Sequence, residues 1–509
     1  MATEDTEDGR RERPSSARFP APAPRSIALI EPVGDVGIGG YTHELAQALC
    51  GHGVRVSVFA RPDTFALRLP RAYRLLPVLG LPTEEAEAVL RGPGAPHPDP
   101  EPPLPAGAFA LEPYFDALER LEARRAAASA AAASRAASTP SAEPAAGDRA
   151  DAGDGAAGGA AGTSPRAGGR GTAPETHLPA PAEAGTPGAA ARAARVRTPD
   201  EARERTRALA THLLHGGFDA VWTQWPVLAG HARGFHRLLS AAGMPLAHTV
   251  HNVFPHERGA GEVAASEAAY RAARALVVHS QWSAAALDRA FPGTAERTIG
   301  SWHGLYTMFP RAAGARRAVR QRLGVGEGRP LLLCFGPVRP YKNGDAVIAA
   351  LADARCRDAV LAVAGSEWGY AELVLGDRLG RTRRLAARHG VADRVRLLPG
   401  AFGLRQAAEL FEAADAVVLP YTESYGSGVL LLAMSFGKHV VATAAGGMDE
   451  YLAHYAASTL LHGHDPASVA DGIARAIPRL GDPPAPRPPR FEWPAITARL
   501  LPCLGHLLG

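Results

Sequence analysis

Lysine is almost absent from this chain of 509 residues. Of its 55 lysines and arginines, only Lys342 and Lys438 are lysines. A compact ammonium and a planar guanidinium are not interchangeable at a tight site, so a lysine kept against this bias marks a candidate site. Both lysines stand in segments with a phosphate-binding pattern. Chance retention is the alternative explanation.

Long apolar runs, clustered cysteines and a strong charge are also missing. No run of about 18 apolar residues predicts a membrane span, and the charged first residues lack the apolar stretch of a secretory signal. The four scattered cysteines favour a reducing cytoplasm. A net charge of +4 without a long basic run argues against nucleic acid as a partner. We expect a cytoplasmic protein, with peripheral contact at the inner face of the membrane left open.

Two segments are too poor in large apolar residues to form a core. We expect residues 1–25 to be a disordered tail. Residues from about 80 to 200, which include the alanine- and glycine-rich stretch 124–194, are expected to be a largely disordered insertion. For this insertion we favour a passive linker over contact with anionic lipid.

The rest of the chain alternates short apolar runs with helical patterns, which predicts parallel sheets. Strands are expected at 26–31, 54–59, 220–223, 246–250 and 275–279, then at 330–335, 359–364, 394–398, 416–419 and 440–443. The two series predict an α/β protein with two Rossmann-like, doubly wound domains, 26–308 and 309–488, whose ligands bind at the carboxyl ends of the strands. A final helix, 489–509, is expected to dock at the domain junction.

Residues 416–447 read as strand, glycine-rich loop, helix and strand. The loop holds Gly426, Ser427 and Gly428, and a helix is expected from Val429. Such a loop leaves backbone N–H groups unpaired at a helix N-terminus, where the helix dipole favours an anion. The segment therefore predicts a phosphate site at Ser427, Gly428 and Val429.

A second candidate loop, GPVRPYKNG at residues 336–344, follows an apolar strand. After Gly336 it carries Arg339 and Lys342, two cations that can clamp a diphosphate and neutralise charge on a departing phosphate. The alternative is a solvated basic loop. Near the start of the chain, Gly39 and Gly40 either let a ligand approach the backbone or form a plain tight turn.

Three further positions are candidates for contacts to a substrate. His251, in the segment HTVHNVFPHE, can exchange a hydrogen bond with a hydroxyl. A metal site with His256 is rejected because the two histidines are five apart and Pro255 interrupts any helix, and a structural turn is the other alternative. His303 is a ligand contact or a turn cap. Glu450 is a hydroxyl acceptor or a charge that complements a helix dipole.

These segments together resemble glycosyltransferases of the GT-B fold, in particular the retaining family-4 group. The segments that carry the likeness are GIGGYTHELAQAL, TVHNVFPHE, VVHSQWS, HGLY, FGPVRPYKNG and LPYTESYGSGVLLLAMSFGKHVVATAAGG. The likeness is strongest to bacterial enzymes that build exopolysaccharide or lipid-linked glycans. It implies a nucleotide-sugar donor in the C-terminal domain, a sugar or lipid-linked acceptor in the N-terminal domain, and no metal or other cofactor.

The resemblance also implies roles for single residues. Arg339 and Lys342 match the basic pair that clamps the diphosphate. Gly39 and Gly40 match the loop near the donor phosphates. His251 matches the histidine near the transferred sugar, and Glu450 matches the acidic residue after a Gly-Gly turn. The resemblance further implies a transfer with retained anomeric configuration.

The chain departs from the family pattern in the loop before the phosphate-binding helix. The family carries two glutamates eight positions apart, and those positions hold Ser424 and Leu432 here. Glu423 lies one position from the first and is a candidate substitute. Two alternative functions stay open: another nucleotide-sugar enzyme, such as a hydrolase or epimerase, and a non-catalytic partner that binds nucleotide sugar.

Overall fold

The computed structural model describes residues 22–33, 37–61, 64, 66, 69–79, 81, 83–91, 198–226, 231, 234–254, 260–311, 313–365, 378–400, 402–480 and 484–509. Most of the predicted tail and insertion therefore lies outside the described residues, as do Pro255 and His256. No helix in the described ranges is long and apolar enough to span a membrane.

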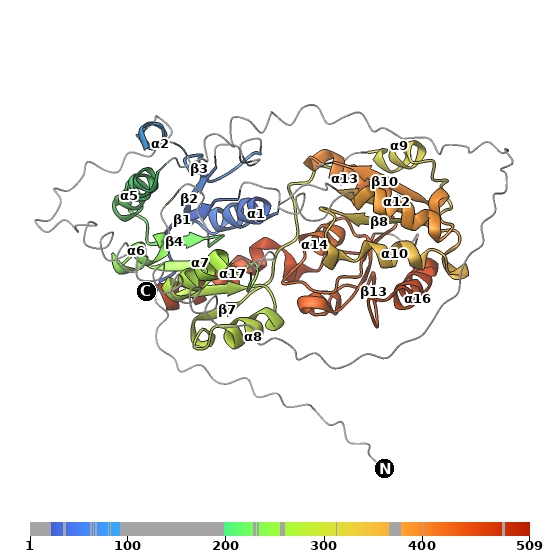
Figure 1. Ribbon diagram of the computed structural model, residues 1–509. Coiled ribbons are helices and arrows are strands. Elements are labelled where there is room, and N and C mark those ends of the chain that lie inside the picture. Colours follow the sequence, from blue (N-terminus) through green and yellow to red (C-terminus); the bar gives the residue numbers. More distant parts are fainter. Residues whose placement is uncertain are drawn as a thin grey trace, which may run out of the picture. The chain divides into compact units, whose positions relative to one another are not determined.

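The N-terminal half is built on one fully parallel sheet (Figure 1). Its order is β3-β2-β1-β4-β5-β6-β7. The strands are β1 (Ser26–Glu31), β2 (Arg55–Ala60), β3 (Arg74–Leu76), β4 (Ala220–Thr223), β5 (Leu246–Thr249), β6 (Ala275–Val278) and β7 (Thr298–Gly300). The helices between them are α1 (Ile38–Gly51), α2 (Thr83–Arg91), α5 (Pro199–His215), α6 (Phe235–Ala241), α7 (Ala260–Ala272) and α8 (Gln281–Ala290).

A second parallel sheet organises the C-terminal half, in the order β10-β9-β8-β11-β12-β13. The strands are β8 (Leu331–Phe335), β9 (Val360–Gly365), β10 (Val395–Pro399), β11 (Ala416–Leu419), β12 (His439–Ala442) and β13 (Ser458–Leu460). The helices are α9 (Ala315–Arg322), α10 (Gly344–Ala350), α12 (Arg378–Arg388), α13 (Leu404–Ala413), α14 (Gly428–Ser435), α15 (Met448–Leu452) and α16 (Pro466–Ala476).

The predicted α/β architecture with two doubly wound sheets is confirmed. The central strands are buried apolar runs, as expected where helices cover both faces of a parallel sheet. The order of each sheet reverses at one point, between β1 and β4 and between β8 and β11. Ligands bind at such switch points in doubly wound folds.

The last helix, α17 (Trp493–Leu508), belongs to the core of the N-terminal sheet. Leu500, Leu504 and Leu508 pack there with residues of α1, β1 and β2. Figure 1 shows this red helix among the blue and green elements of the first half. The chain therefore crosses back to its first sheet, and both sheets fall within one compact unit.

The segment after β7 joins the two halves. Glu44 of α1 accepts hydrogen bonds from the Thr307 and Met308 amides and, at 2.7 Å, from the Thr307 hydroxyl. The Tyr306 amide donates to the Ser435 hydroxyl of α14 over 2.9 Å. These contacts fix Tyr306 between an N-terminal helix and a C-terminal helix.

Candidate functional site

The loop after β8 places Lys342 at the carboxyl edge of the second sheet. Residues Pro340–Lys342 form a 3-10 turn that ends at Asn343, whose backbone is left-handed with φ at 53°. The Asn343 amide group donates to the Pro420 carbonyl at 3.3 Å and to the His464 carbonyl at 2.6 Å. Side-chain hydrogen bonds of this kind stabilise a left-handed conformation that is otherwise rare outside glycine. The turn thus presents Lys342 in one fixed place.

Lys342 lies near Val429 in the first turn of α14. Its ammonium donates to the Phe335 carbonyl at 3.1 Å. A β-carbon on Gly336, where φ is +90°, would stand 2.6 Å from Lys342 Nζ and 3.8 Å from a methyl group of Val429. The Thr422 amide also donates to the Tyr341 carbonyl over 2.9 Å, which ties the two loops together.

Burial makes the Lys342 ammonium lose its proton at a lower pH than an ordinary lysine. It lowers the pKa of the ammonium to about 8, and the nearby positive charge of Arg339 acts in the same direction. Arg339 itself is half-buried. The two positive charges repel each other, and an anion bound beside them would relieve that repulsion.

The N-terminus of α14 offers backbone donors beside this ammonium. The Ser427 hydroxyl caps the helix by accepting from the Leu430 amide at 3.2 Å. The amides of Gly428 and Val429 donate to no acceptor within the described parts of the chain. Free N–H groups at a helix start, next to a buried cation, are groups that suit an anion.

The N-terminus of α1 lies close to the N-terminus of α14, with Tyr306 between them. Gly39 and Gly40 are buried in the first turn of α1, which begins at Ile38, so they belong to a helix and not to a separate tight turn. A β-carbon on Gly40 would lie 3.4 Å from the Tyr306 ring, and one on Gly428 would lie 2.9 Å from the Tyr306 hydroxyl. One tyrosine ring therefore separates the starts of α1 and α14, and the sequence did not point to Tyr306 as the contact between them.

Three histidines follow three neighbouring strands of the first sheet. His251 comes after β5, His279 after β6 and His303 after β7. Their rings surround Tyr41 of α1, with centroid distances of 4.8 Å to His251, 5.0 Å to His279 and 5.0 Å to His303. We call these three residues the histidine cluster.

The histidine cluster is uncharged. Burial lowers the pKa of His251 to about 3 and that of His303 to about 4, and it holds the pKa of His279 well below the usual value. His303 Nδ1 pairs with the Gly304 carbonyl at 2.9 Å. Within the described residues, no group of three or more histidines, cysteines and carboxylates is arranged to hold a metal ion. A cluster of neutral imidazoles suits hydrogen bonds to hydroxyl groups.

Glu450 lies at the contact between the two halves. Its carboxylate accepts from the Gln281 amide at 2.8 Å and the Trp282 amide at 2.9 Å, the first turn of α8. Next to it, the Tyr451 hydroxyl donates to the His279 carbonyl over 2.7 Å and accepts from the His303 amide over 2.9 Å. Glu450 thus complements a helix dipole, but that of a helix in the other half of the chain.

Two candidates remain, Glu423 and Lys438. Glu423 is exposed. Lys438 precedes β12, at the edge of the sheet opposite the loops, and its ammonium donates to the Glu412 carbonyl at 3.0 Å. Leu432, in the family's second glutamate position, is a buried core residue of α14. The structure does not bring Lys438 to the other candidates.

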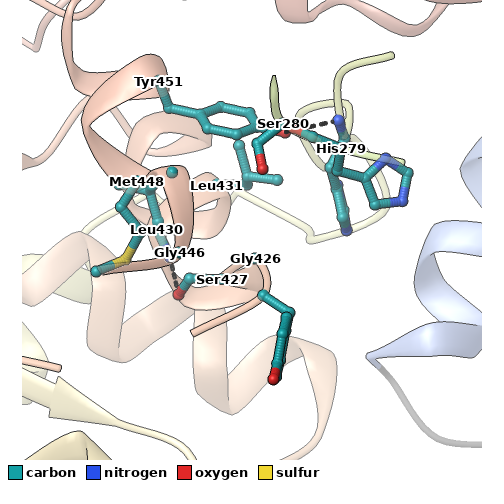
Figure 2. Close-up of a pocket in the computed structure, with 12 residues that line it drawn as sticks. His279, Ser280, Gly426, Ser427, Leu430, Leu431, Gly446, Met448 and Tyr451 are labelled. Carbon is teal, nitrogen blue, oxygen red and sulfur yellow. Dashed lines mark hydrogen bonds between the residues drawn. The ribbon is translucent and has the colours of Figure 1, made fainter. Parts of the chain in front are cut away.

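One pocket is lined by residues of both halves of the chain (Figure 2). We call the second-half lining residues, together with Lys342, Arg339, Gly428 and Val429, the second-half wall, and the first-half lining residues, together with His251, the first-half wall. Figure 2 shows Tyr451, on its helix, extending toward Ser280 and His279 while Ser427 and Gly426 line another side. Gly447, with φ at +80°, allows this contact because a β-carbon there would stand 2.8 Å from the Ser280 side chain. The first half supplies His279, Ser280 and His303, and the second supplies Tyr425, Gly426, Ser427, Leu430, Leu431, Gly446, Gly447, Met448 and Tyr451.

Two parallel doubly wound sheets with loops facing each other at their carboxyl ends define the GT-B class of fold. Residues 315–479 match the family model described as glycosyl transferases group 1. The chain is 30% identical to a D-inositol 3-phosphate glycosyltransferase of Xylanimonas cellulosilytica, over 57% of this chain and 72% of that protein. The chain therefore belongs to the glycosyl transferases group 1 family.

Other relatives are matched over less of their length. The chain is 34% identical to the D-inositol 3-phosphate glycosyltransferase of Salinispora arenicola, over 47% of this chain and 57% of that protein. It spans only 42% of the protein of that name from Streptomyces coelicolor.

Among solved structures, sucrose-phosphate synthase of Thermosynechococcus elongatus is 16% identical with a TM-score of 0.51. The match covers 95% of this chain and 94% of that one. A similarity at this level of identity supports the fold and nothing beyond it.

Proposed function

We propose that the protein transfers a sugar from a nucleotide-sugar donor to a sugar or lipid-linked acceptor, with retention of the anomeric configuration and without a metal ion. The observation that carries the proposal is one juxtaposition. Lys342 lies near Val429 at the start of α14, whose cap Ser427 lines the pocket from the second half, and the neutral His279 and His303 line the pocket from the first half.

The second-half wall would hold the leaving group. Lys342, Arg339 and the amides of Gly428 and Val429 offer positive charge and N–H donors to a diphosphate, as helix N-termini do for phosphates elsewhere. These groups are in place before any ligand arrives. Preorganised donors of this kind stabilise charge that develops in a transition state.

The first-half wall would hold the sugar. In the proposed step, the acceptor oxygen forms a bond to the anomeric carbon on the face from which the diphosphate departs, and the bond from that carbon to phosphate oxygen breaks. The hydroxyl proton passes to the departing phosphate oxygen. Neutral His251 donates or accepts a hydrogen bond at a sugar hydroxyl and stays uncharged throughout.

Donor entry requires the walls to separate. The pocket has room for roughly one water molecule, far less than a sugar ring occupies. Glu450 and Tyr451 hold α8 and the histidine cluster against the second half, so their hydrogen bonds would break and form again in each cycle. Whether Glu450 then reaches a donor hydroxyl, as the sequence suggested, stays a prediction.

A panel of labelled nucleotide sugars tests the proposal. Each is incubated with sugar acceptors, lipid-linked acceptors and D-inositol 3-phosphate, the last because relatives carry that name. We expect transfer from at least one donor, unchanged by EDTA, with a product of the donor's anomeric configuration by NMR. Release of free sugar alone would support a hydrolase, binding without turnover a non-catalytic partner, and an inverted product would contradict retention.

The cytoplasmic location and the peripheral membrane contact stay predictions. Flotation with vesicles of anionic and of neutral lipid tests the second. Binding to anionic vesicles only would support an acceptor presented at a membrane surface, and no binding would favour a freely diffusing acceptor.

A further inference from the structure

His279 has both ring nitrogens buried without a partner. Its side chain is 3% exposed, and neither Nδ1 nor Nε2 has a hydrogen-bond partner in the described parts of the chain. Three other buried histidines do have side-chain partners: His43 pairs with Tyr73 at 2.9 Å, His248 with Thr223 at 2.7 Å and His439 with Thr459 at 2.8 Å. An unsatisfied buried polar group destabilises the folded protein, so its presence calls for a reason.

The side chains around His279 do not supply hydrogen-bond partners for its ring nitrogens. Its ring lies against the ring of Tyr41 at 5.0 Å, that of His251 at 5.5 Å and that of His303 at 5.5 Å. These are ring contacts that leave the nitrogens unpaired. The backbone of His279 is already held, because its carbonyl accepts the Tyr451 hydroxyl at 2.7 Å. The imidazole is therefore fixed in place with its hydrogen-bonding capacity unused.

His279 lies where a bound donor sugar is expected. It lines the pocket that also holds Ser427, the cap of the phosphate-binding helix. It also contacts the ring of His251, whose Nε2 is buried without a partner as well. His279 therefore borders both Ser427, across the pocket, and the ring of His251.

We propose that His279 binds a hydroxyl group of the transferred sugar, as a specificity-determining residue of the reaction proposed above. A neutral imidazole has one N–H donor and one nitrogen acceptor, and a hydroxyl group likewise both donates and accepts. A phosphate would be better served by a cation, which the opposite wall already supplies in Lys342. The inference rests on the proposed function, since it assigns a contact within that site.

The proposal predicts discrimination between donors that differ by one hydroxyl. A site built to hydrogen-bond a hydroxyl rejects the analogue that lacks it, because its own polar group is left unpaired. We therefore expect one deoxy analogue of the donor to be used at least about tenfold less well by the unaltered protein. In His279→Phe, which keeps an aromatic ring but no hydrogen-bonding group, the preference at that one position disappears, and His279→Gln retains part of it.

A second buried histidine supplies the control. His236 of α6 is 4% exposed and its Nε2 also has no partner within the described residues, but it does not line the pocket with Ser427. His236→Phe should leave every deoxy-to-parent ratio of kcat/KM unchanged. Unchanged ratios in a folded His279→Phe protein would overturn the proposal and leave His279 a packing residue.

A binding measurement separates this proposal from the proposed function. Histidine-labelled full-length protein is titrated with each donor, and the ¹⁵N signals of His279 are identified by their loss in His279→Phe. We expect them to shift with the donor and not with its nucleoside diphosphate alone. Donor binding without a shift overturns the His279 contact even if sugar is transferred. A shift without transfer rejects the glycosyltransferase and retains the contact.

Discussion

The two walls of the candidate site differ in how far their polar groups are satisfied. On the second-half wall, the Lys342 ammonium and the Ser427 hydroxyl each have an internal partner. On the first-half wall, His279 and His251 leave three ring nitrogens without a partner among the described residues. The first arrangement is rigid and positively charged, whereas the second is neutral and incomplete.

This difference separates two tasks of recognition. A diphosphate is common to all nucleotide-sugar donors, and a fixed cation with backbone amides is sufficient for it. A sugar is distinguished by its hydroxyl groups, which neutral side chains read through single hydrogen bonds. The comparison predicts that variants on the charged wall lose rate with every donor, while variants on the histidine wall change which donor is used.

The largest effect is expected for Lys342→Ala. It removes the buried cation beside the α14 amides, and turnover should fall by about 10²–10³, by analogy with the loss of one oxyanion-hole donor. Steady-state kinetics with any active donor measures this. Lys438→Ala, the other lysine of the chain, should change turnover by less than about twofold because Lys438 lies at the opposite edge of the sheet. Equal losses in both variants would remove the distinction between them.

Donor binding should depend on pH through the Lys342 ammonium. Burial lowers the pKa of Lys342 to about 8, so the free protein loses this charge as the pH rises through 8. Above that value the KM for the donor should rise by up to about tenfold per pH unit. Lys342→Arg should abolish the rise because a guanidinium stays charged.

Lys438 is the matched control for this titration. Burial lowers its pKa to about 8 as well. Lys438→Arg should keep the rise in KM, since this lysine does not reach the pocket. If the rise in KM above pH 8 persisted in Lys342→Arg and vanished in Lys438→Arg, the titrating group would be Lys438 and not Lys342.

A smaller effect is expected for Gly428→Ala. The added methyl group would stand 2.9 Å from the Tyr306 hydroxyl, and such overpacking costs about 1–3 kcal/mol. We expect weaker binding of every donor, measured by calorimetry, together with a lower melting temperature. Gly344→Ala changes the first residue of α10, where nothing lies within 4 Å, and should have no such effect.

The smallest effect is expected where the walls are tied together. Glu450→Ala removes both hydrogen bonds to the start of α8, which is worth about 0.5–2 kcal/mol by analogy with helix caps. Thermal unfolding should show the loss. Asp449→Ala, which removes an exposed carboxylate from the same turn of α15, should not lower the melting temperature. An equal loss in both variants would make the bonds of Glu450 irrelevant to stability.

The sequence predicted the central strands to within about a residue because buried parallel strands are short apolar runs. The three strands for which it gave no bounds are β3, β7 and β13. All three are edge strands of three residues, with the sequences RLL, TIG and STL. Such segments show no recognisable pattern, and their pairing is set by the neighbouring strand.

The sequence could predict which site residues lie close together where their loops follow neighbouring strands of the same sheet. Lys342 and Ser427 follow β8 and β11, which are neighbours at the switch point. The placement of Glu450 was not predictable, since its partner α8 belongs to the other sheet. Lys438 could have been set aside, because it precedes its strand and so lies at the opposite edge. Three histidines after three adjacent strands were visible, but their unpaired nitrogens appear only once the side chains are packed.

A crystal structure with the nucleoside diphosphate of an active donor tests the central claim most directly. The account predicts that the two phosphates lie between Lys342 Nζ and the amides of Gly428 and Val429. A diphosphate bound elsewhere, with this position empty or filled by an apolar side chain, would contradict it.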